Sequence, residues 1–551
     1  GARALVVLCC CRVSFGSDVG DMLWKKQRGA AVLCVLSLWV LSLAGCRGAS
    51  HGDEKLRTFF QGSNGKEEGT KWAVLVAGSN NWWNYRHQAD VCHAHQILRE
   101  NGFPDERVIV MRYDDLENNM DNPMPGVVIN SKECIPHEKD AQGNWVLPNE
   151  RCNVNQGCAK DYFGASVSPE NFLNVLKGDA EAAKRNCETM SKDPAVFGGC
   201  NGKVLNSTDK DHVFVAFFDH GGVHMIGMPP ARKWGAMRYV TANQLLDAIT
   251  FMDASAMYGE MILYIEACES GSMFNGLLPK NISVWAATAA DPFHSSYASD
   301  CGTSFENQAL PCLGDLFSVE WMRDVESHDM ERETWKEDWK FAEKHTNLSQ
   351  VCEYGDDSLA KDSIASYLEY PPCNCSSPSP ALQAPSEQQQ QQQQEEEEVP
   401  EGVVSSREAK MAFLLNAQAH QGLTSLNKEY LAEREEREFV DELMAKVLAT
   451  AGLGISSVEE AAAPQGLAHI HVPKLCHTKP APPHWTRGAY DPEYFACLTG
   501  IIDAYQSICR PLTGYSMRYT KAFSDMCASG VSVEKVQAAF RAFCDRPVQA
   551  F

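Results

Sequence analysis

The chain has 551 residues, more than one compact core normally holds, so its length predicts several folded segments joined by linkers. Acidic residues outnumber basic ones by 72 to 49, which gives a formal net charge of -23. A field of this sign repels nucleic acids and anionic membranes, so neither is expected as the main partner.

Residues 1–49 are predicted to be a leader and a secretory signal peptide. From Met22 a basic stretch precedes an apolar run from Ala30 to Ala44, and small residues follow. A retained signal anchor is the alternative, but the apolar run is short for a membrane span. After signal cleavage no membrane attachment is expected, and residues 50–70 would form a short N-terminal pro-segment.

The cysteine content agrees with export, because oxidising compartments favour disulfides. Five of the 22 cysteines fall within the leader and signal, which leaves seventeen. An odd number predicts at least one free thiol. Four Asn-x-Ser/Thr sequons indicate the same secretory route: Asn206, Asn281, Asn347 and Asn374.

Residues 71–370 alternate apolar runs with helix signals, a pattern typical of an α/β domain with a largely parallel sheet. One helix is expected over 88–100, a second from Ser168-Pro169, where a capping residue precedes proline, and a third from Thr241. Strands are expected at 72–77, 108–113, 212–218, 261–265 and 284–290.

The composition changes near residue 370. Residues 371–405 are rich in Ser and Pro and contain runs of Gln and Glu, so they are predicted to be a solvated linker open to proteases. Residues 406–551 carry helical patterns only, including a long helix over 425–449 and shorter ones between 491 and 544. They are predicted to form a separate α-helical domain.

Chemically unusual residues follow three of the predicted strands. Asn84 and its neighbours come after the first strand, Asp219-His220-Gly221-Gly222 after the third, and Glu266-Ala267-Cys268 after the fourth. The carboxyl ends of parallel strands are where such sheets build their sites. These residues are therefore expected to converge.

Cys268 and His220 offer a nucleophile and a base, because an imidazole can lower the pKa of a thiol and later protonate a leaving amine. The glycines beside His220 expose backbone N–H groups that could hold an oxyanion. From the residues alone three alternatives stay open: a buried or disulfide-bonded cysteine, a structural histidine, and a Cys/His metal site, for which no further ligands stand at metal spacing.

The segments around these residues resemble the core motifs of the legumain (asparaginyl endopeptidase) family of cysteine peptidases. The resemblance covers about Lys71 to Gly355 and implies a caspase-like sheet, mostly parallel and flanked by helices, with an α-helical C-terminal prodomain. It rests on Val76–Asn80, Trp83–Asp90, Tyr113–Asp115, Asp219–Gly222 and Tyr264–Ser272.

The resemblance also implies roles for individual residues, with no metal and no cofactor. Cys268 would attack the substrate, His220 would act as base, and Asn84 would orient the imidazole. The N–H groups of Gly221 and Cys268 would form the oxyanion hole, and Asp219 matches an aspartate prone to succinimide formation. The S1 pocket, which holds the residue before the cleaved bond, would be lined by Arg86, His87, Glu266, Ser295 and Asp315.

Such a pocket suits asparagine, whose side chain has an acceptor at one end and a donor at the other. Arg86 could donate to the carbonyl, while Glu266 and Asp315 accept from the amide. An ionised aspartate would be repelled, so cleavage after Asn is expected in general, and after Asp only in acid. Without the resemblance, Arg86 and Asp315 would be interpreted as an ordinary ion pair.

Some features depart from the family pattern. Cysteine-rich insertions around Cys134, Cys152 and Cys158, and around Cys187 and Cys200, are expected to form local disulfide loops. Asp291 stands where many relatives have asparagine, and His224 follows the glycine pair. Either could alter substrate preference.

The prodomain would inhibit the enzyme until the linker is cut between about Pro371 and Ser406. Asn374 is a candidate self-cleavage point, although it is also a sequon. Cystatin-type inhibitors are possible partners beside peptide and protein substrates, and the destination is an acidic vacuole or lysosome-like compartment, or secretion. The prodomain disulfides would use Cys476, Cys497, Cys509, Cys527 and Cys544.

Two alternatives for the function remain. A peptide ligase on the same scaffold would resolve the acyl-enzyme with an amine instead of water, and a catalytically silent secreted glycoprotein would only bind partners. A lipid-anchor transamidase is disfavoured, because no C-terminal membrane span follows the catalytic region.

Overall fold

The structure is a computed structural model, and it describes residues 69–190, 196–232, 235–346, 348–370, 401–421, 424–452 and 491–544. These residues all belong to one unit, Glu67–Phe551. The predicted leader, signal and most of the pro-segment lie outside the described residues, as do most of the linker, Asn347, Asn374 and Cys476.

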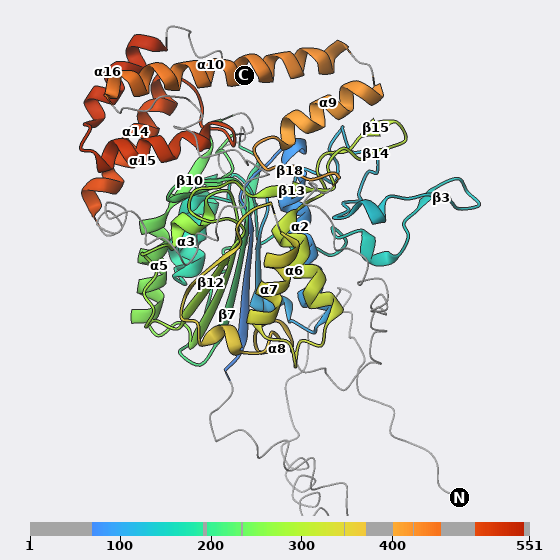
Figure 1. The fold of residues 1–551 in the computed structure, drawn as a ribbon. Helices are drawn as coiled ribbons and strands as arrows, with labels where there is room; N and C mark the ends of the chain where they lie inside the picture. Colours follow the sequence, from blue (N-terminus) through green and yellow to red (C-terminus); the bar gives the residue numbers. More distant parts are fainter. Residues whose placement is uncertain are drawn as a thin grey trace, which may run out of the picture. The chain divides into compact units, whose positions relative to one another are not determined.

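An eight-stranded sheet lies at the centre of the fold, in the order β17-β12-β11-β7-β1-β2-β5-β6 (Figure 1). The six inner strands pair in parallel, and the edge strands β17 (Cys352–Gly355) and β6 (Gly198–Cys200) pair antiparallel. The inner strands are β12 (Val284–Thr288), β11 (Glu260–Glu266), β7 (His212–Phe218), β1 (Lys71–Ala77), β2 (Val108–Met111) and β5 (Tyr162–Gly164). The predicted mostly parallel sheet is confirmed.

Successive residues of β1 point alternately into two hydrophobic cores, one on each face of the sheet. Val74 and Val76 pack with one set of helices, α3 (Pro169–Leu176), α4 (Ala180–Met190) and α5 (Ala242–Ala254). Leu75 packs on the other face with α2, α6, α7 and α8 (Figure 1). Those helices span Tyr85–Glu100, Leu316–Ser327, Trp335–His345 and Ala365–Leu368. A strand buried on both faces accounts for its uninterrupted apolar sequence.

Three predicted helix starts can be compared with the structure, and α5 begins directly after Thr241, as expected. Helix α3 begins as expected, because the Ser168 hydroxyl accepts a hydrogen bond from the Asn171 N–H at 3.1 Å and Pro169 opens the helix. Helix α2 begins at Tyr85, three residues before the predicted start at Gln88. The extra residues place Arg86 and His87 on its first turn, next to the end of β1.

Several short strands connect the large elements. Strands β8 (Gly221–Gly222), β9 (Met225–Met228) and β10 (Arg238–Thr241) form one small sheet. A second contains β16 (Gly314–Asp315), β13 (Tyr297–Ser299) and β18 (Val404–Ser405). Two hairpins complete the set: β3 (Glu138–Lys139) with β4 (Trp145–Val146), and β14 (Ser304–Phe305) with β15 (Gln308–Ala309).

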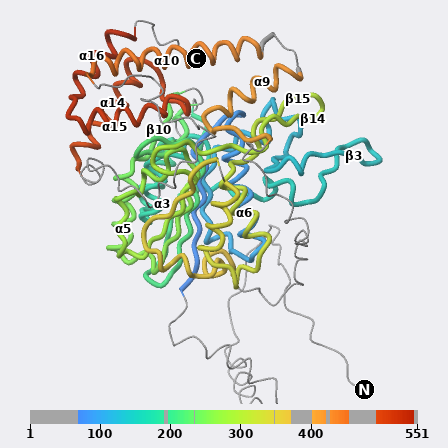
Figure 2. The backbone as a smooth tube through the Cα atoms, viewed as in Figure 1, coloured from blue at the N-terminus to red at the C-terminus, as the bar shows by residue number. Residues whose placement is uncertain are grey.

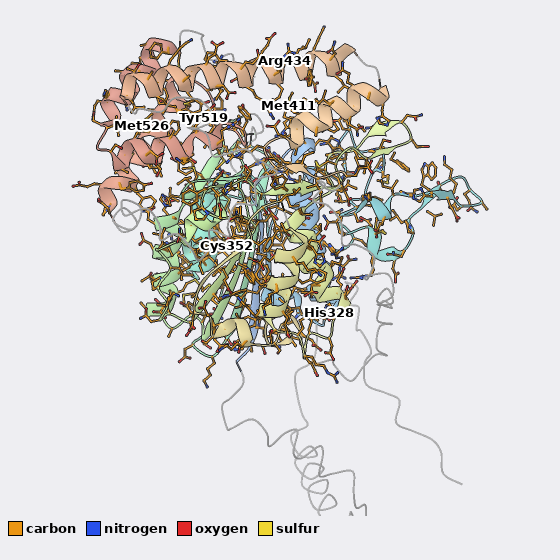
Figure 3. All side chains as sticks on the ribbon, in the orientation of Figure 1. His328, Cys352, Met411, Arg434, Tyr519 and Met526 are labelled. Atoms are coloured by element: carbon orange, nitrogen blue, oxygen red, sulfur yellow. A yellow bond between two sulfur atoms is a disulfide. The ribbon has the colours of Figure 1, made fainter. Side chains whose placement is uncertain are left out.

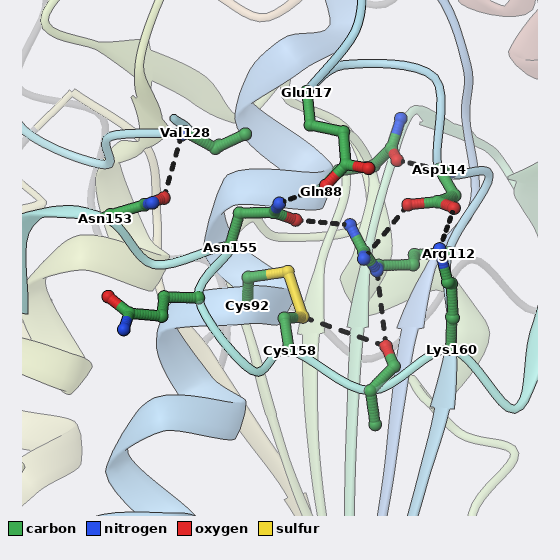
Figure 4. The surroundings of a disulfide bond; sticks show 12 residues. Gln88, Cys92, Arg112, Asp114, Glu117, Val128, Asn153, Asn155, Cys158 and Lys160 are labelled. Atoms are coloured by element: carbon green, nitrogen blue, oxygen red, sulfur yellow. Dashed lines mark hydrogen bonds and ion pairs between the residues drawn. A yellow bond between two sulfur atoms is a disulfide. The ribbon is translucent and has the colours of Figure 1, made fainter. Parts of the chain in front are cut away.

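Disulfides anchor the cysteine-rich insertions. Cys134–Cys152 and Cys187–Cys200 close local loops, as predicted. Cys158 instead bonds Cys92 of α2, 66 residues away, so the expectation of a local loop is wrong for this cysteine (Figure 4). Cys92 belongs to the same buried cluster as Val154 of the insertion, so the insertion packs on the face of α2 that carries Cys92. Among the described residues, Cys268 is the free cysteine.

The C-terminal part is helical, as predicted (Figures 1 and 2). Its helices are α9 (Ala409–Gln421), α10 (Thr424–Ala451), α14 (Pro492–Ile508), α15 (Thr520–Ala528) and α16 (Val533–Phe543). Disulfides Cys497–Cys527 and Cys509–Cys544 link them, and Figure 3 shows Tyr519 and Met526 among their side chains. Within the described ranges, no helix has the length and hydropathy that crossing a membrane requires.

Candidate active site

The carboxyl ends of β1, β7 and β11 bring the predicted site residues together. Register fixes this edge, since Ala77 pairs with Phe218 and Phe218 pairs with Glu266. Two further backbone bonds continue the alignment: the Gly78 N–H donates to the Phe218 carbonyl, and the Asp219 N–H donates to the Glu266 carbonyl, both at 3.0 Å. His220 and Cys268 each lie two residues beyond the end of their strand, and the two strands, β7 and β11, are neighbours.

The imidazole of His220 is oriented by Asn84. The Asn84 amide nitrogen donates to the Asn80 carbonyl at 2.9 Å, which turns the Asn84 carbonyl oxygen toward His220. That oxygen lies 2.8 Å from Nε2 of His220, so Nε2 carries the proton and donates. Nδ1 of His220 is buried and has no hydrogen-bond partner among the described residues. It is therefore the nitrogen that can accept a proton.

Gly221 allows a very close approach between the histidine and cysteine segments. A Cβ atom on Gly221 would lie 2.2 Å from the carbonyl oxygen of Cys268, so no side chain fits there. The Cys268 thiol is buried, and its sulfur lies 3.8 Å from the Ser296 hydroxyl. Because the two backbone segments lie this close together, the N–H groups of Gly221 and Cys268 can both point toward one atom.

Burial keeps both reactive groups neutral in this form. Burial raises the pKa of the Cys268 thiol, and nearby Arg407 opposes that shift. Burial also lowers the pKa of His220 well below its usual value, and the charges of Arg86 and Arg407 add to the effect. A thiol and a neutral imidazole, rather than an ion pair, therefore occupy the closed site.

The predicted pocket residues form a buried cluster around Arg86. The Arg86 Nε donates to Asp315 at 2.7 Å, and both side chains are inaccessible to solvent. One oxygen of Glu266 accepts from the Ser318 N–H and hydroxyl at 3.2 and 3.0 Å. The other Glu266 oxygen and the Arg86 Nη2 have no hydrogen-bond partner among the described residues. A buried donor or acceptor without a hydrogen bond costs free energy unless a bound group supplies the missing partner.

His87 lies beside the same cluster. Its Nδ1 is 2.5 Å from the Ser79 hydroxyl, and its Nε2 is 3.5 Å from Asp315. Its ring meets the His220 ring edge to face, with 5.1 Å between centroids. Asp219 is also buried here, and burial raises its pKa to about 8. These contacts connect the predicted pocket to His220.

His87, Asp219 and His220 also offer three ligand atoms within 4.8 Å of one another. The charge of the Arg86 guanidinium lowers the pKa of both histidines, so a cation bound here would meet the same repulsion. Asn84 already engages Nε2 of His220. The cluster is thus better suited to hydrogen bonding than to holding a metal ion.

The structure adds two residues that the sequence did not single out. Ser296 lies between the thiol and the pocket: its hydroxyl lies near Cys268, and it opposes the rise in the pKa of Glu266 that burial and the charge of Asp315 cause. Asp90 accepts from the Asp315 N–H at 3.2 Å and from the Asn130 amide at 2.7 Å. Asp90 is one helical turn after Arg86, a spacing that could have indicated it.

The segment that begins at the end of the predicted linker, with Val404 and Ser405, lies in this site. Strand β18 pairs antiparallel with β13, with Ser405 opposite Tyr297. The Ser406 N–H continues the pairing by donating to the Ser296 carbonyl at 2.9 Å, and the Ser406 and Ser296 hydroxyls lie 3.1 Å apart. Burial raises the pKa of Asp315, and a hydrogen bond from the Ser406 hydroxyl opposes that shift. Ser406 is therefore the residue presented to the predicted pocket.

Arg407, the next residue, is buried at the centre of the site. Its Nε donates to the Ser295 hydroxyl at 3.1 Å, and its guanidinium forms an ion pair with Glu269, whose side chain is 1% exposed. Its guanidinium also donates to two backbone carbonyl oxygens, from Nη2 to that of Gly221 at 3.2 Å and from Nη1 to that of Gly514 at 2.9 Å. Ser295, predicted to line the pocket, thus contacts Arg407 in this structure.

The helical part also touches the histidine itself. A Cβ atom built on Gly514 would lie 2.8 Å from two atoms of the His220 ring, so Gly514 packs directly on the imidazole. Nearby, the Thr520 hydroxyl accepts from the Val223 N–H at 2.8 Å, and His224 lies 2.7 Å from the Tyr494 hydroxyl. The turn after His220 is therefore covered by helical residues.

Asp291, which like His224 departs from the family pattern, orders a loop. Its carboxylate accepts from the N–H groups of Phe293 and His294 at 2.7 and 2.9 Å and pairs with the His294 ring. The His294 carbonyl in turn accepts from the Glu269 N–H at 2.8 Å. Asp291 thus helps to hold the residue that follows Cys268.

Comparison with known proteins gives consistent results over both parts of the chain. A model described as the Peptidase C13 family matches residues 71–370, and one described as the legumain prodomain matches residues 491–544. The chain is 33% identical over 494 residues to the vacuolar-processing enzyme beta-isozyme of Arabidopsis thaliana, covering 86% of each protein. It is 32% identical over 498 residues to legumain of Canavalia ensiformis, covering 87% of this chain and 89% of the relative. Legumain of Bos taurus is 44% identical over 295 residues, or 54% of this chain and 58% of that protein.

Proposed function

Because the chain belongs to the Peptidase C13 (legumain) family of cysteine endopeptidases, we propose that it hydrolyses peptide bonds after asparagine, with Cys268 as nucleophile and His220 as base. The observation that carries the proposal is the pocket around Arg86. It holds an unused donor on Arg86 and an unused acceptor on Glu266, and a carboxamide satisfies both at once.

In the proposed reaction the Cys268 sulfur attacks the backbone carbonyl carbon of the asparagine while Nδ1 of His220 takes the thiol proton. The N–H groups of Gly221 and Cys268 stabilise the oxyanion. The protonated imidazole then gives its proton to the leaving amine, which departs and leaves a thioester. Water, deprotonated by His220, releases the acid and restores the thiol. Asn84 keeps the imidazole in the required tautomer throughout.

Aspartate should replace asparagine only in acid. A protonated aspartic acid resembles asparagine, whereas an ionised one would add a negative charge beside Asp315, which pairs with Arg86, and beside Glu266, whose pKa burial and Asp315 already raise. Since an aspartyl side chain has a pKa of about 3.9, the Asp-to-Asn ratio of kcat/KM is expected to rise steeply as pH falls from about 6 to about 4. Matched peptides measured across this range test the expectation. A ratio that stays constant with pH would contradict it.

The proposed inhibitor is the chain's own segment around Ser406 and Arg407, held in place by the C-terminal helices. It runs along β13 as an extended strand, reaches the pocket with Ser406, and continues into α9. Serine is too short to use the donor on Arg86 and the acceptor on Glu266. The segment would therefore bind in the manner of a substrate without offering asparagine for cleavage.

Ser406→Asn is expected to turn this segment into a substrate. The longer carboxamide can reach the pocket, so acid incubation should produce a new fragment that begins at Arg407, detected by intact mass and N-terminal sequencing. Ser405→Asn is the matched control, because adjacent residues of a strand point to opposite faces. Equal cleavage at the introduced asparagine in both variants, or no such fragment from Ser406→Asn while added Asn peptides are cut, would contradict the assignment.

Gly514→Ala is expected to loosen the inhibitory contact. Its Cβ would overlap the His220 ring, which Asn84 holds in place, and such overpacking typically costs about 1–3 kcal/mol. Peptide hydrolysis by the uncleaved protein should therefore rise about tenfold. Gly500→Ala in α14, where a Cβ would approach only Val533, serves as control. Equal basal rates in the two variants would show that Gly514 does not hold the closed form.

The processing and destination of the chain complete the proposal. Relatives named vacuolar-processing enzymes support an acidic vacuole or lysosome-like compartment after signal cleavage. Activation would require cutting within the linker that precedes β18. Asn206 and Asn281 are exposed and thus open to glycosylation. Inhibition by cystatin-type proteins remains a prediction.

Product analysis tests the proposal against its alternatives. Acid-treated protein is incubated with an Asn-containing peptide and an added amine nucleophile near neutral pH, and the products are identified by mass spectrometry. Free acid as the main product supports hydrolysis, and an amide joined to the amine supports a peptide ligase. Intact peptide under every condition would support the silent glycoprotein and refute the proposal.

A further inference from the structure

The contacts of Arg407 describe a subsite on the far side of the cleaved bond. If Ser406 lies where asparagine binds, Arg407 lies where a substrate places its next residue. Three of its four partners, Ser295, Gly221 and Glu269, belong to the sheet domain. They stay behind when the helical part is removed, so the subsite does not depend on Gly514.

Glu269 supplies the charge of this subsite. It follows Cys268 directly in the left-handed region, with φ of 50°, and the bond from its N–H to the His294 carbonyl fixes its backbone. Its carboxylate is buried. One oxygen pairs with Arg407, and the other has no hydrogen-bond partner among the described residues. Losing Arg407 would leave a carboxylate in a poorly solvated position, where a new cation is favoured.

We infer that the activated protein prefers a basic residue immediately after the cleaved bond, so that its favoured substrates contain Asn-Arg or Asn-Lys. The inference rests on the proposed cleavage after asparagine and adds a second determinant to it. Arginine should exceed lysine, because a guanidinium can reach Glu269, the Ser295 hydroxyl and the Gly221 carbonyl at the same time.

The preference should depend on pH. Burial raises the pKa of Glu269 to about 7, while Arg407 and His294 lower it and Asp291 raises it. Cys268, the remaining titratable neighbour, stays neutral as a thiol. Because only the ionised carboxylate pairs with a cation, the advantage of arginine is present above this pKa and is lost as pH falls through it.

Four peptides that differ only in the residue after asparagine test the inference: arginine, citrulline, alanine and glutamate. Citrulline keeps the shape of arginine without its charge. Near pH 8, kcat/KM of the activated protein for arginine is expected to exceed that for citrulline about tenfold and that for glutamate about 100-fold. The arginine-to-citrulline ratio should approach one near pH 5. In Glu269→Gln it should be close to one at both pH values.

Equal kcat/KM for arginine, citrulline and glutamate in the wild type would overturn the inference while leaving cleavage after asparagine intact. An undiminished arginine preference in Glu269→Gln would overturn the role of this carboxylate. If none of the four peptides is cut, the proposed function itself fails. Because each ratio compares substrates within one protein, a general loss of activity in the variant does not affect it, and the wild-type ratios decide the matter if the variant does not fold.

Discussion

Cys268→Ala is expected to lower kcat/KM for an Asn-containing peptide by about a thousandfold or more, since no other nucleophile can replace the thiolate in the acyl-transfer step. Among the described residues Cys268 is the free cysteine, so no neighbouring thiol can substitute for it. Release of a fluorophore from an Asn-terminated tripeptide at about pH 5.5, measured before and after acid incubation, gives the rates.

The variant should remain folded, which separates chemistry from stability. Removing one buried sulfur leaves a small cavity that costs on the order of 1 kcal/mol. The thermal midpoint should therefore stay within a few degrees of the wild type. Cys268→Ser, nearly the same shape, should be almost as inactive. Equal fluorophore release by wild type and Cys268→Ala would refute the assignment of the nucleophile.

Arg86→Met is expected to lower kcat/KM for asparagine peptides by about 10²- to 10⁴-fold, because a pocket built to hydrogen-bond a side chain loses its discrimination without the donor. It should also destabilise the protein by about 3–5 kcal/mol, since the buried carboxylate of Asp315 would lose its ion-pair partner. Initial rates and thermal unfolding, measured on the same samples, report the two effects.

The double variant Arg86→Met with Asp315→Leu distinguishes the two effects. It removes both charges of the buried pair, so the stability should largely return. Cleavage after asparagine should not return, because the donor is still absent. An Arg86→Met protein that cuts asparagine peptides within about threefold of the wild-type rate would show that the pocket recognises its substrate in another way.

The sequence was most informative about the strands of the parallel sheet and about the residues that follow them. The apolar runs ending at Ala77, Phe218 and Glu266 pair in register, which brings the residues after each run to one edge. That placement follows from local patterns and one general rule about parallel sheets. For this reason the sequence alone predicts that Asn84, His220 and Cys268 lie together.

Contacts made by residues far apart in the sequence could not be predicted. Arg407 meets Glu269 across 138 residues, and Gly514 reaches His220 only through the packing of the C-terminal helices. Neither residue belongs to a motif. Cys158 was misassigned for the same reason, since its pairing depends on how the insertion folds against α2. The sequence also placed Val404 and Ser405 in the linker, whereas they form an ordered strand beside β13.

The most direct test of the whole account is labelling with a peptide electrophile that carries asparagine next to its reactive group, followed by mass mapping of the modified residue. The account predicts that Cys268 is labelled after acid activation, that the uncleaved protein is labelled far more slowly, and that a matched probe with leucine in place of asparagine does not react. Modification of another residue, or equal labelling of Cys268 by both probes and in both forms of the protein, would contradict it.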